Sequence, residues 1–345
     1  MQLPDSMRAI YIVREGDAQK AFETREVPIP KPEPHEILIK VHSFGLNFAD
    51  VMARQGLYRD RPPLPCVVGY DVAGEIAAVG SEVSDRQVGQ RVTAMTRFGG
   101  YAEYAVTDAR ATAVIDDDFG YGEATALCTQ YSTAWYASEY VARIRPGDHV
   151  LIHAAAGGVG TALVQIAKHR GATIFGTAGS QVKLDMLREA GVDYPINYRT
   201  QDWVAECRKV VGDRGMDFIF DSIGADYFKK GKKLLGAGGR LVCYGAASMS
   251  GITNPIGKLR KGLAFGLYHP AEFLMDSQSM IGVNMLRIAD HRQDVIAWCL
   301  EGVVQGCREG WLKPKVGARF SADQIAEAQT ALETRKTTGK VVVSW

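Results

Sequence analysis

The 345-residue sequence has only six cysteines, and they are scattered along the chain. Its cysteines are Cys66, Cys128, Cys207, Cys243, Cys299 and Cys307, with no C-x-x-C spacing among them. This scatter excludes a disulfide framework and a zinc knuckle, and it is typical of proteins in a reducing compartment. We therefore expect a cytoplasmic protein.

An excess of charge is also absent. Lys and Arg number 40 and Asp and Glu number 39, a net charge of +1, so the total does not call for a nucleic acid partner. No basic region followed by an apolar stretch opens the chain, so we expect no signal peptide. Residues 149–167 lack Asp, Glu, Lys and Arg, but three glycines interrupt them. A strand and a helix joined by a tight turn explain this span better than a transmembrane helix.

The composition, 46% hydrophobic and 23% charged, is that of an ordinary globular protein, and the length favours two domains. Short strands separated by Pro-rich and Gly-rich turns fill the first 125 or so residues, which predicts an irregular, barrel-like β domain. After about residue 130, apolar strands alternate with helical segments, which predicts a parallel sheet covered on both faces. We expect the last helices and the strand Lys340–Val343 to return to the first domain.

A glycine-rich turn lies between a predicted strand, His149–Ala154, and a predicted helix that runs to about Arg170. Its sequence is Ala155-Ala156-Gly157-Gly158-Val159-Gly160, so a G-x-G-x-x-G reading fails only at its first glycine. Gly157 would let the backbone approach a pyrophosphate, and Gly160 would allow close helix–strand packing. Free N–H groups at the helix start attract the anion, so we expect a dinucleotide here; small residues that merely permit tight packing are the alternative.

The residues after the second strand indicate which dinucleotide binds. An NAD site places an acidic residue about 20 positions after the glycines. Here Thr177-Ala178-Gly179-Ser180 has no carboxylate, Lys183 follows, and Tyr198 comes after the next apolar stretch. Hydroxyls and an ammonium suit a 2′-phosphate, which favours NADP(H). A solvated turn with an ordinary helix-start serine is the alternative.

Three polar residues in the β domain are candidate catalytic residues: Asn47, Asp50 and Tyr58. Asn47 and Asp50 have the spacing of a helix N-cap and its third residue, and this capping role is an alternative to a catalytic one. Tyr58 follows the predicted helix Phe48–Gln55 and precedes a Pro-rich loop, from which a phenol could reach a cleft. A packing tyrosine is the alternative.

Motifs spread over most of the chain resemble those of the medium-chain dehydrogenase/reductases, in the zinc-free quinone oxidoreductase (zeta-crystallin-like) branch. The matching residues, in chain order, are Gly45-Leu46-Asn47-x-x-Asp50, Arg54-x-Gly56-x-Tyr58, Gly69-x-Asp71-x-Ala73-Gly74, Ala154 to Gly160 with Gln165-Ile166-Ala167, Gly176-Thr177-Ala178, Asp221-Ser222-Ile223-Gly224, Gly238-Gly239-Arg240 and Gly339-Lys340-Val341. The segment after residue 245 is most similar to the vesicle amine transport (VAT-1) relatives of that branch.

The resemblance implies an α/β protein with two domains. A GroES-like β-rich catalytic domain would comprise residues 1–128 and 290–345, and a Rossmann doubly wound parallel-sheet domain residues 129–289. The cofactor-binding residues would be Gly157, Gly158, Val159, Gly160 and Thr177, with Ser180, Lys183 and Tyr198 around the 2′-phosphate and Tyr244 and Gly245 near the nicotinamide ribose. Tyr58 matches the tyrosine that is the proposed proton donor in related enoyl reductases of this superfamily. Asn47 would line the nicotinamide side of the cleft.

The resemblance also implies that no metal is bound. Zinc-dependent relatives have cysteine ligands at the positions that match Asn47 and Thr129 and a histidine ligand at the position that matches Tyr70, and this sequence has neither residue type at those three positions. Without a Lewis acid, a plain alcohol is a poor substrate. We therefore expect hydride transfer from NADPH to a quinone or an α,β-unsaturated carbonyl, with an enoyl-thioester reductase as the rival enzyme.

A non-catalytic NADPH-binding interaction protein is the alternative from another class. Its support is a basic cluster of Lys229, Lys230, Lys232, Lys233, Lys258, Arg260 and Lys261 beside the apolar residues 263–268, which an ordinary solvated helix face also explains. The resemblance further suggests a homodimer formed through the strand around Met280–Met285. The partners expected are thus a small-molecule acceptor and a second copy of the chain, without nucleic acid.

Overall fold

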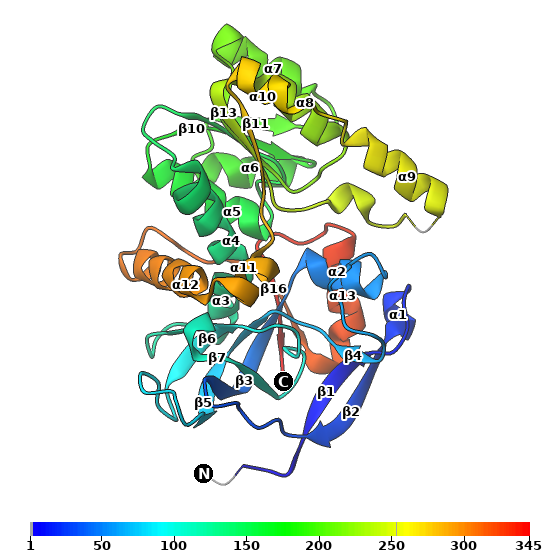
Figure 1. The fold of residues 1–345 in the computed structure, drawn as a ribbon, viewed down its shortest axis with the longest axis vertical. Coiled ribbons are helices and arrows are strands. Elements are labelled where there is room, and N and C mark those ends of the chain that lie inside the picture. Colours follow the sequence, from blue (N-terminus) through cyan, green and yellow to red (C-terminus); the bar gives the residue numbers. More distant parts are fainter. Residues whose placement is uncertain (1–2, 253) are drawn as a thin grey trace. The chain divides into compact units, whose positions relative to one another are not determined.

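The computed structural model describes residues 3–252 and 254–345, in two compact units. Unit 1 comprises Met1–Ser132 and Met285–Trp345, and unit 2 comprises Thr133–Asn284. In Figure 1 the blue and red ends of the chain lie together in unit 1. Among the described residues, no helix is both long enough and apolar enough to cross a bilayer.

Unit 1 is built mainly on antiparallel strands, and only the pair at one edge of its larger sheet, residues 316–321 with 340–344, is parallel among the described strand pairs. Its main sheet has the order β15(Val316–Ser321), β16(Lys340–Ser344), β3(Glu36–Leu46), β5(Asp71–Val79), β6(Arg91–Met95), β8(Thr112–Val114), with β7(Tyr104–Asp108) also pairing with β3. A smaller sheet has the order β2(Phe22–Pro28), β1(Ser6–Ile12), β4(Cys66–Val67). The last strand, β16, pairs with β3 in the register Val342↔Gly45. The predicted return of the C-terminal strand to the first domain is therefore confirmed.

Several helices of unit 1 pack against the strands of its main sheet. The helices of this unit are α1(Ala18–Ala21), α2(Phe48–Arg54), α3(Tyr121–Ala126), α11(Met285–His291), α12(Gln293–Arg308) and α13(Ile325–Glu333). The helix that starts as α3 continues through a π-helical segment, Leu127–Tyr131, and then α4(Ser132–Trp135). β3 supplies the centre of the core: Ile37, Leu38, Ile39 and Phe44 are fully buried.

Unit 2 contains one six-stranded sheet in which every pair is parallel. Its order is β11(Tyr194–Asn197), β10(Thr173–Ala178), β9(His149–Ile152), β12(Met216–Asp221), β13(Leu235–Cys243), β14(Ser279–Gly282). Counted along the chain this is 3-2-1-4-5-6, the doubly wound order that binds dinucleotides where the strand order reverses. Val150, Leu151 and Ile152 are fully buried, as expected of a strand covered on both faces. The predicted α/β fold with a parallel sheet is confirmed.

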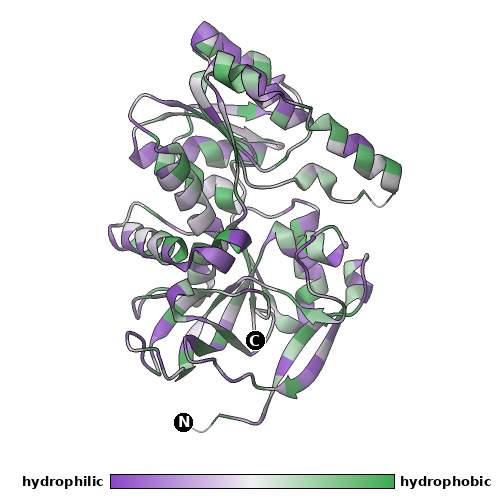
Figure 2. Ribbon diagram, in the orientation of Figure 1, coloured by the Kyte–Doolittle hydropathy of each residue, from purple (hydrophilic) through white to green (hydrophobic). Residues whose placement is uncertain are grey.

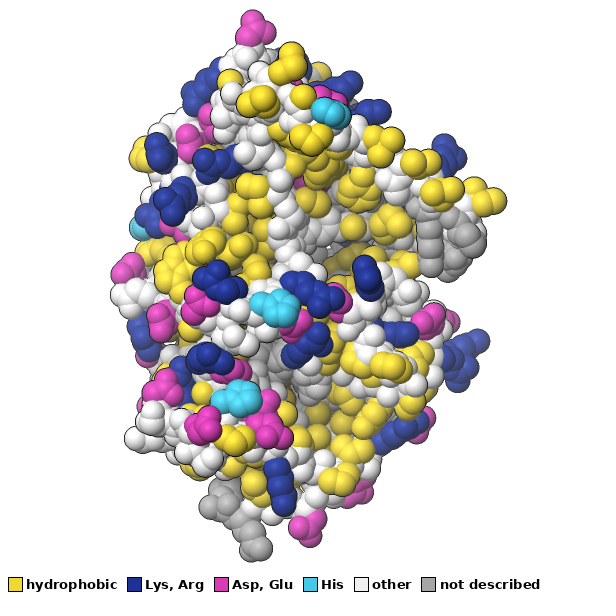
Figure 3. Space-filling view, in the orientation of Figure 1, with side chains coloured by type: hydrophobic (Ala, Val, Ile, Leu, Met, Phe, Trp, Pro, Cys, Tyr) yellow, Lys and Arg dark blue, Asp and Glu magenta, His cyan; other side chains and the backbone are white. Residues whose placement is uncertain are grey.

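The helices of unit 2 are α5(Gly158–His169), α6(Gln181–Glu189), α7(Trp203–Val211), α8(Asp226–Leu234), α9(Pro255–Ala264) and α10(Pro270–Asp276). Figure 2 shows alternating green and purple along them, the pattern of amphipathic helices. In α9 the apolar stripe is uncovered: Ile256 and Leu259 are 81% and 66% exposed. Apolar side chains accordingly follow this helix in Figure 3.

Candidate active site

Asn47 and Asp50 begin α2, directly after β3. The Asp50 carboxylate accepts the Asn47 backbone N–H at 2.7 Å, the N3 part of a capping box. Asp50 is fully buried, and this burial raises its pKa to about 7. The hydrogen bond from the Asn47 N–H has the opposite, smaller effect on the pKa. The structure thus gives Asp50 the capping role that its spacing predicted. Its catalytic role stays a prediction.

The Arg54-x-Gly56-x-Tyr58 motif ends α2 and releases the tyrosine. The buried Arg54 guanidinium donates to Gln329 Oε1 at 3.2 Å and pairs with Glu333 at 2.5 Å, both on α13. Gly56 has a φ of +69°, the left-handed conformation of a helix C-cap glycine, and it turns the chain out of the helix. Tyr58 is consequently half-buried, and burial raises its pKa, so the phenol is protonated at neutral pH.

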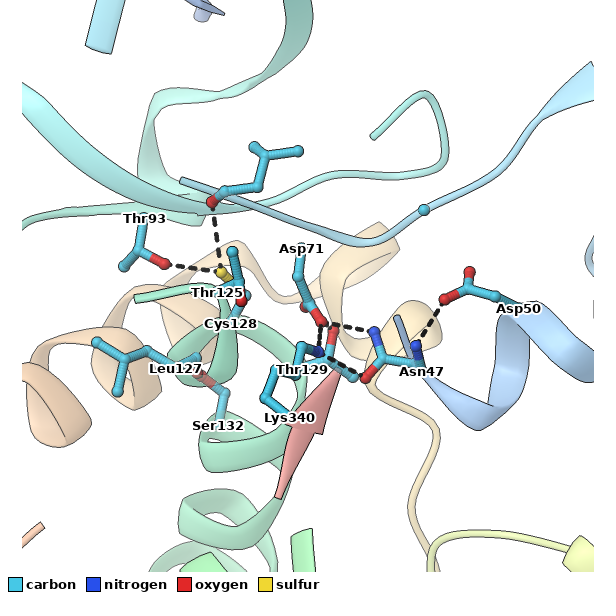
Figure 4. A network of polar contacts seen from close by, with 12 residues as sticks. Asn47, Asp50, Asp71, Thr93, Thr125, Leu127, Cys128, Thr129, Ser132 and Lys340 are labelled. Carbon is cyan, nitrogen blue, oxygen red and sulfur yellow. Dashed lines mark hydrogen bonds and ion pairs between the residues drawn. The ribbon is translucent and has the colours of Figure 1, made fainter. Parts of the chain in front are cut away.

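Asn47 belongs to a buried polar network (Figure 4). Its Nδ2 donates to Asp71 Oδ2 at 2.5 Å, and its Oδ1 accepts from Lys340 Nζ at 3.0 Å. Lys340 also pairs directly with Asp71, and the Thr129 hydroxyl donates to Asp71 Oδ1. Asp71 and Lys340 are both fully buried. Both ends of the Asn47 amide therefore have fixed partners, which determine its orientation.

Local sequence explains how distant segments reach this network. β16 runs beside β3, and at Gly45 a Cβ would overlap the Lys340 side chain, so the glycine leaves room for the lysine. Thr129 lies in the π-helical segment, an irregularity that often marks functional positions. Cys128, next to it, is buried, which raises its pKa to about 12 and keeps the thiol protonated.

The donor set of this network does not suit zinc. Zinc prefers thiolate and imidazole ligands, whereas this network contains an amide, a carboxylate and a hydroxyl. The Lys340 ammonium contacts both Asn47 Oδ1 and Asp71. A metal cation bound to those oxygens would stand beside this positive charge and compete with it.

In unit 2 the glycine-rich turn fits a pyrophosphate. Gly157 is the N-cap of α5, whose first turn has no acidic residue, so free N–H groups and the positive end of the helix dipole attract an anion. At Gly160, a Cβ would overlap the Ala154 carbonyl oxygen and lie 2.7 Å from Ala155 Cα, so helix and strand approach closely. The left-handed residue of the turn is Ala154, with a φ of +51°. Gly158 and Val159 form the first turn of α5.

The residues expected around a 2′-phosphate also lie together in unit 2. Ser180 is the N-cap of α6, and Lys183 stands in that helix's first turn, which has no acidic residue. At Gly179, a Cβ would come within 2.5 Å of the Tyr198 hydroxyl, so this phenol lies against the same turn. Tyr244 and Gly245 follow β13, where a Cβ at Gly245 would lie 2.8 Å from the Ser222 carbonyl oxygen. All of these are at the carboxyl edge of the sheet, where such folds bind ligands.

Thr177 lies against His153, behind the glycine-rich turn. The Thr177 hydroxyl is 3.1 Å from His153 Nδ1 and 3.3 Å from the Ala154 nitrogen, so it holds the turn. His153 is fully buried, with the rings of Trp203 and Tyr227 at 4.6 and 4.9 Å. Burial lowers its pKa to about 3. Sequence reasoning assigned no role to His153, Lys340 or Tyr70, although one quoted motif contains Lys340 and another spans Tyr70 at an unspecified position.

We expect His153 to make the protein acid-sensitive. The unfolded chain binds a proton near pH 6.5 and the folded chain only near pH 3, so stability falls as the pH drops through this window. The loss is about 3 kcal/mol at pH 4.5, because one pH unit corresponds to roughly 1.4 kcal/mol. Urea unfolding at pH 7.5 and pH 4.5 measures it: His153→Phe removes this part of the loss, whereas His35→Phe, at an exposed site, keeps it. Equal pH dependence in wild type and His153→Phe would contradict the assignment.

Comparisons with known proteins identify the class. Residues 33–117 match the family "Alcohol dehydrogenase GroES-like domain", and residues 158–301 match "Zinc-binding dehydrogenase". Both parts of the fold predicted from the sequence, GroES-like and Rossmann-type, are thereby confirmed. The chain belongs to the medium-chain dehydrogenase/reductase family, together with the quinone oxidoreductases and the VAT-1 homologues.

Individual relatives and structures agree with this class. The synaptic vesicle membrane protein VAT-1 homolog of Danio rerio is 34% identical over 98% of this chain and 70% of its own length. Human quinone oxidoreductase is 31% identical over 98% of this chain and 97% of its own. A mycobacterial protein solved with NADPH has a TM-score of 0.85 at 29% identity, covering 99% and 100% of the two chains. The CurK enoyl reductase has a TM-score of 0.84 at 29% identity, covering 99% of each.

Proposed function

We propose that this protein is an NADPH-dependent, zinc-independent oxidoreductase that transfers hydride to a quinone or an α,β-unsaturated carbonyl. The observation that carries the proposal is the buried Asn47–Asp71–Lys340 network, whose donor set does not suit zinc, together with the protonated Tyr58 phenol that follows the same helix, α2. The family relation to quinone oxidoreductases supports the reaction class. That the protein is an oxidoreductase follows from its family; the acceptor and the metal independence are the proposal.

NADP(H) is the cofactor, as the sequence predicted. Gly157–Gly160 would hold its pyrophosphate, and Ser180, Lys183 and Tyr198 would hold its 2′-phosphate. When bound, NADPH would supply a hydride, that is two electrons and one proton. Two structurally similar proteins, the mycobacterial protein and the Escherichia coli quinone oxidoreductase, were solved with NADPH, which supports this assignment.

The chain's own residues would complete the reaction. As the acceptor takes hydride at carbon, negative charge develops on its oxygen, and the Tyr58 hydroxyl donates a proton there. The partly exposed Tyr58 phenolate then regains a proton from solvent, so each turnover consumes one NADPH and one proton. Asn47, fixed by Asp71 and Lys340, would orient the neighbouring amide or acceptor oxygen.

Replacing Tyr58 with phenylalanine tests the mechanism. We expect purified protein to oxidise NADPH in the presence of 2-cyclohexen-1-one or 1,2-naphthoquinone, and the variant to lose about 100-fold or more in kcat for the enone, because general acid catalysis typically contributes that much. Tyr104→Phe, on β7, serves as a matched control. Unchanged enone turnover in Tyr58→Phe would remove the role of this tyrosine.

Two alternatives keep some support. An enoyl-thioester reductase would use the same residues, and the likeness to the CurK enoyl reductase favours it as a second candidate. An interaction protein would need the predicted basic cluster, of which Lys232 is paired with Glu272 and Asp276 at 3.3 and 3.0 Å. The side chain of Lys258 lies outside the described part of the chain. We also propose the homodimer, formed through β14, one of the two edge strands of its sheet.

A further inference from the structure

The Tyr70 hydroxyl is a buried polar group that the mechanism above does not use. Tyr70 is 5% exposed, and its hydroxyl has no hydrogen-bond partner among the described residues. A buried hydroxyl without a partner costs free energy of folding, so such a group calls for an explanation. The backbone around Tyr70 is held in place. Gly69, with a φ of +105°, turns the chain immediately before Tyr70, and the Tyr70 carbonyl accepts the Thr96 N–H at 2.8 Å.

Tyr70 packs against Tyr58. The two rings meet edge to face with centroids 6.2 Å apart, and Phe98 supports Tyr70 from 5.3 Å. A side-chain hydrogen-bond interaction with Tyr58 contributes to the raised pKa of Tyr70, although no hydrogen bond of ordinary geometry joins the two hydroxyls. Two phenols thus come from separate segments, one after α2 and one before β5, to the same place in unit 1.

The other polar groups nearby do not account for the Tyr70 hydroxyl. The Asp50 carboxylate raises the pKa of Tyr70, yet Asp50 Oδ1 also has no hydrogen-bond partner among the described residues, so the two groups are not bonded to each other. The charged residues nearby pair with one another and not with Tyr70: Arg287 pairs with Asp60, and Arg97 pairs with Asp290 at 2.5 Å.

We propose that the Tyr70 hydroxyl donates a hydrogen bond to the oxygen of the bound quinone or enone, beside the Tyr58 hydroxyl. This proposal rests on the proposed function. Burial raises the pKa of both phenols, but Tyr70 is almost completely buried whereas Tyr58 is partly exposed. Tyr58 can regain a lost proton from water, and Tyr70 cannot do so readily. Tyr70 therefore binds and polarises the acceptor oxygen and keeps its proton, while Tyr58 transfers one.

Tyr70→Phe tests this division, because it removes one oxygen and keeps the ring that Tyr58 and Phe98 contact. We expect the variant to fold with an unchanged or higher Tm, since the lost hydroxyl had no partner. Its Kd for 1,2-naphthoquinone, measured by quenching of intrinsic fluorescence without cofactor, should rise about tenfold. The KM for the same quinone should rise by a similar factor. A solvent deuterium isotope effect on kcat should persist in Tyr70→Phe and disappear in Tyr58→Phe.

The outcomes separate this proposal from the proposed function. If wild type turns over the enone and Tyr70→Phe leaves KM and the quinone Kd unchanged, the Tyr70 role is wrong and the function stands. If wild type shows no turnover, the function fails, and the quinone Kd alone decides the Tyr70 role. A lower Tm in Tyr70→Phe with an unchanged quinone Kd would assign the hydroxyl to a trapped water near Asp50, and would overturn the proposal.

Discussion

Replacing Lys340 with methionine is expected to lower the free energy of unfolding by about 3–5 kcal/mol, because it leaves a buried carboxylate without its counter-ion. Asp71 and Lys340 are fully buried, so solvent does not screen the pair. The remaining donors to Asp71, Asn47 Nδ2 and the Thr129 hydroxyl, cannot neutralise its charge. Urea unfolding of the two proteins measures the difference.

Two further variants make the Lys340 experiment specific. Lys209→Met removes an exposed lysine that pairs with Glu206 at 2.7 Å, and it should cost less than about 1 kcal/mol. The double variant Asp71→Asn, Lys340→Met contains no buried charge in the network and should recover most of the lost stability. Its kcat should nevertheless fall, by about tenfold, because the Asn47 amide is no longer held between two charged groups. A Lys340→Met variant as stable as wild type would refute the role of the ion pair.

Replacing Gly160 with alanine is expected to weaken NADPH binding by about 100-fold. Inside a helix this substitution normally stabilises, by roughly 0.5–1 kcal/mol. Here the new Cβ would overlap the Ala154 carbonyl oxygen and lie 2.7 Å from Ala155 Cα, so α5 must move away from the turn that it starts. The displaced N–H groups would no longer point at the pyrophosphate.

Titration of NADPH into the Gly160 variant by calorimetry measures this loss. Gly262→Ala is the matched control: Gly262 is also in a helix, α9, and a Cβ there would meet nothing within 4 Å. The control should bind NADPH as wild type does. Equal affinity in Gly160→Ala and Gly262→Ala would show that the close approach at Gly160 does not shape the cofactor site.

Local sequence patterns predicted most of the fold. The apolar run Val150–Ile152 followed by glycines predicted β9 and α5, since a buried strand and a helix start both have short-range signals. Irregular backbone had no such signal. For example, β7 begins only at Tyr104, and Tyr101, just before it, packs its buried ring against Phe44. The π-helical turns between residues 127 and 142 were likewise not predicted.

The site was predictable only in part, for a physical reason. Asn47 and Asp50 are three residues apart, so their capping geometry follows from local helix geometry. Lys340 lies 293 residues from Asn47, and only the pairing of β16 with β3 brings them together. Whether Tyr70 or His153 finds a hydrogen-bond partner depends on all the segments packed around it. No pattern along the chain encodes that.

The central claim is that NADP(H) binds to a protein that needs no zinc. Calorimetric titration of NADPH and of NADH into chelator-treated protein, with its metal content measured by elemental analysis, tests this claim most directly. The account predicts saturable NADPH binding at least tenfold tighter than NADH binding, with no stoichiometric metal. Absence of heat with NADPH, or one zinc retained per chain, would contradict it.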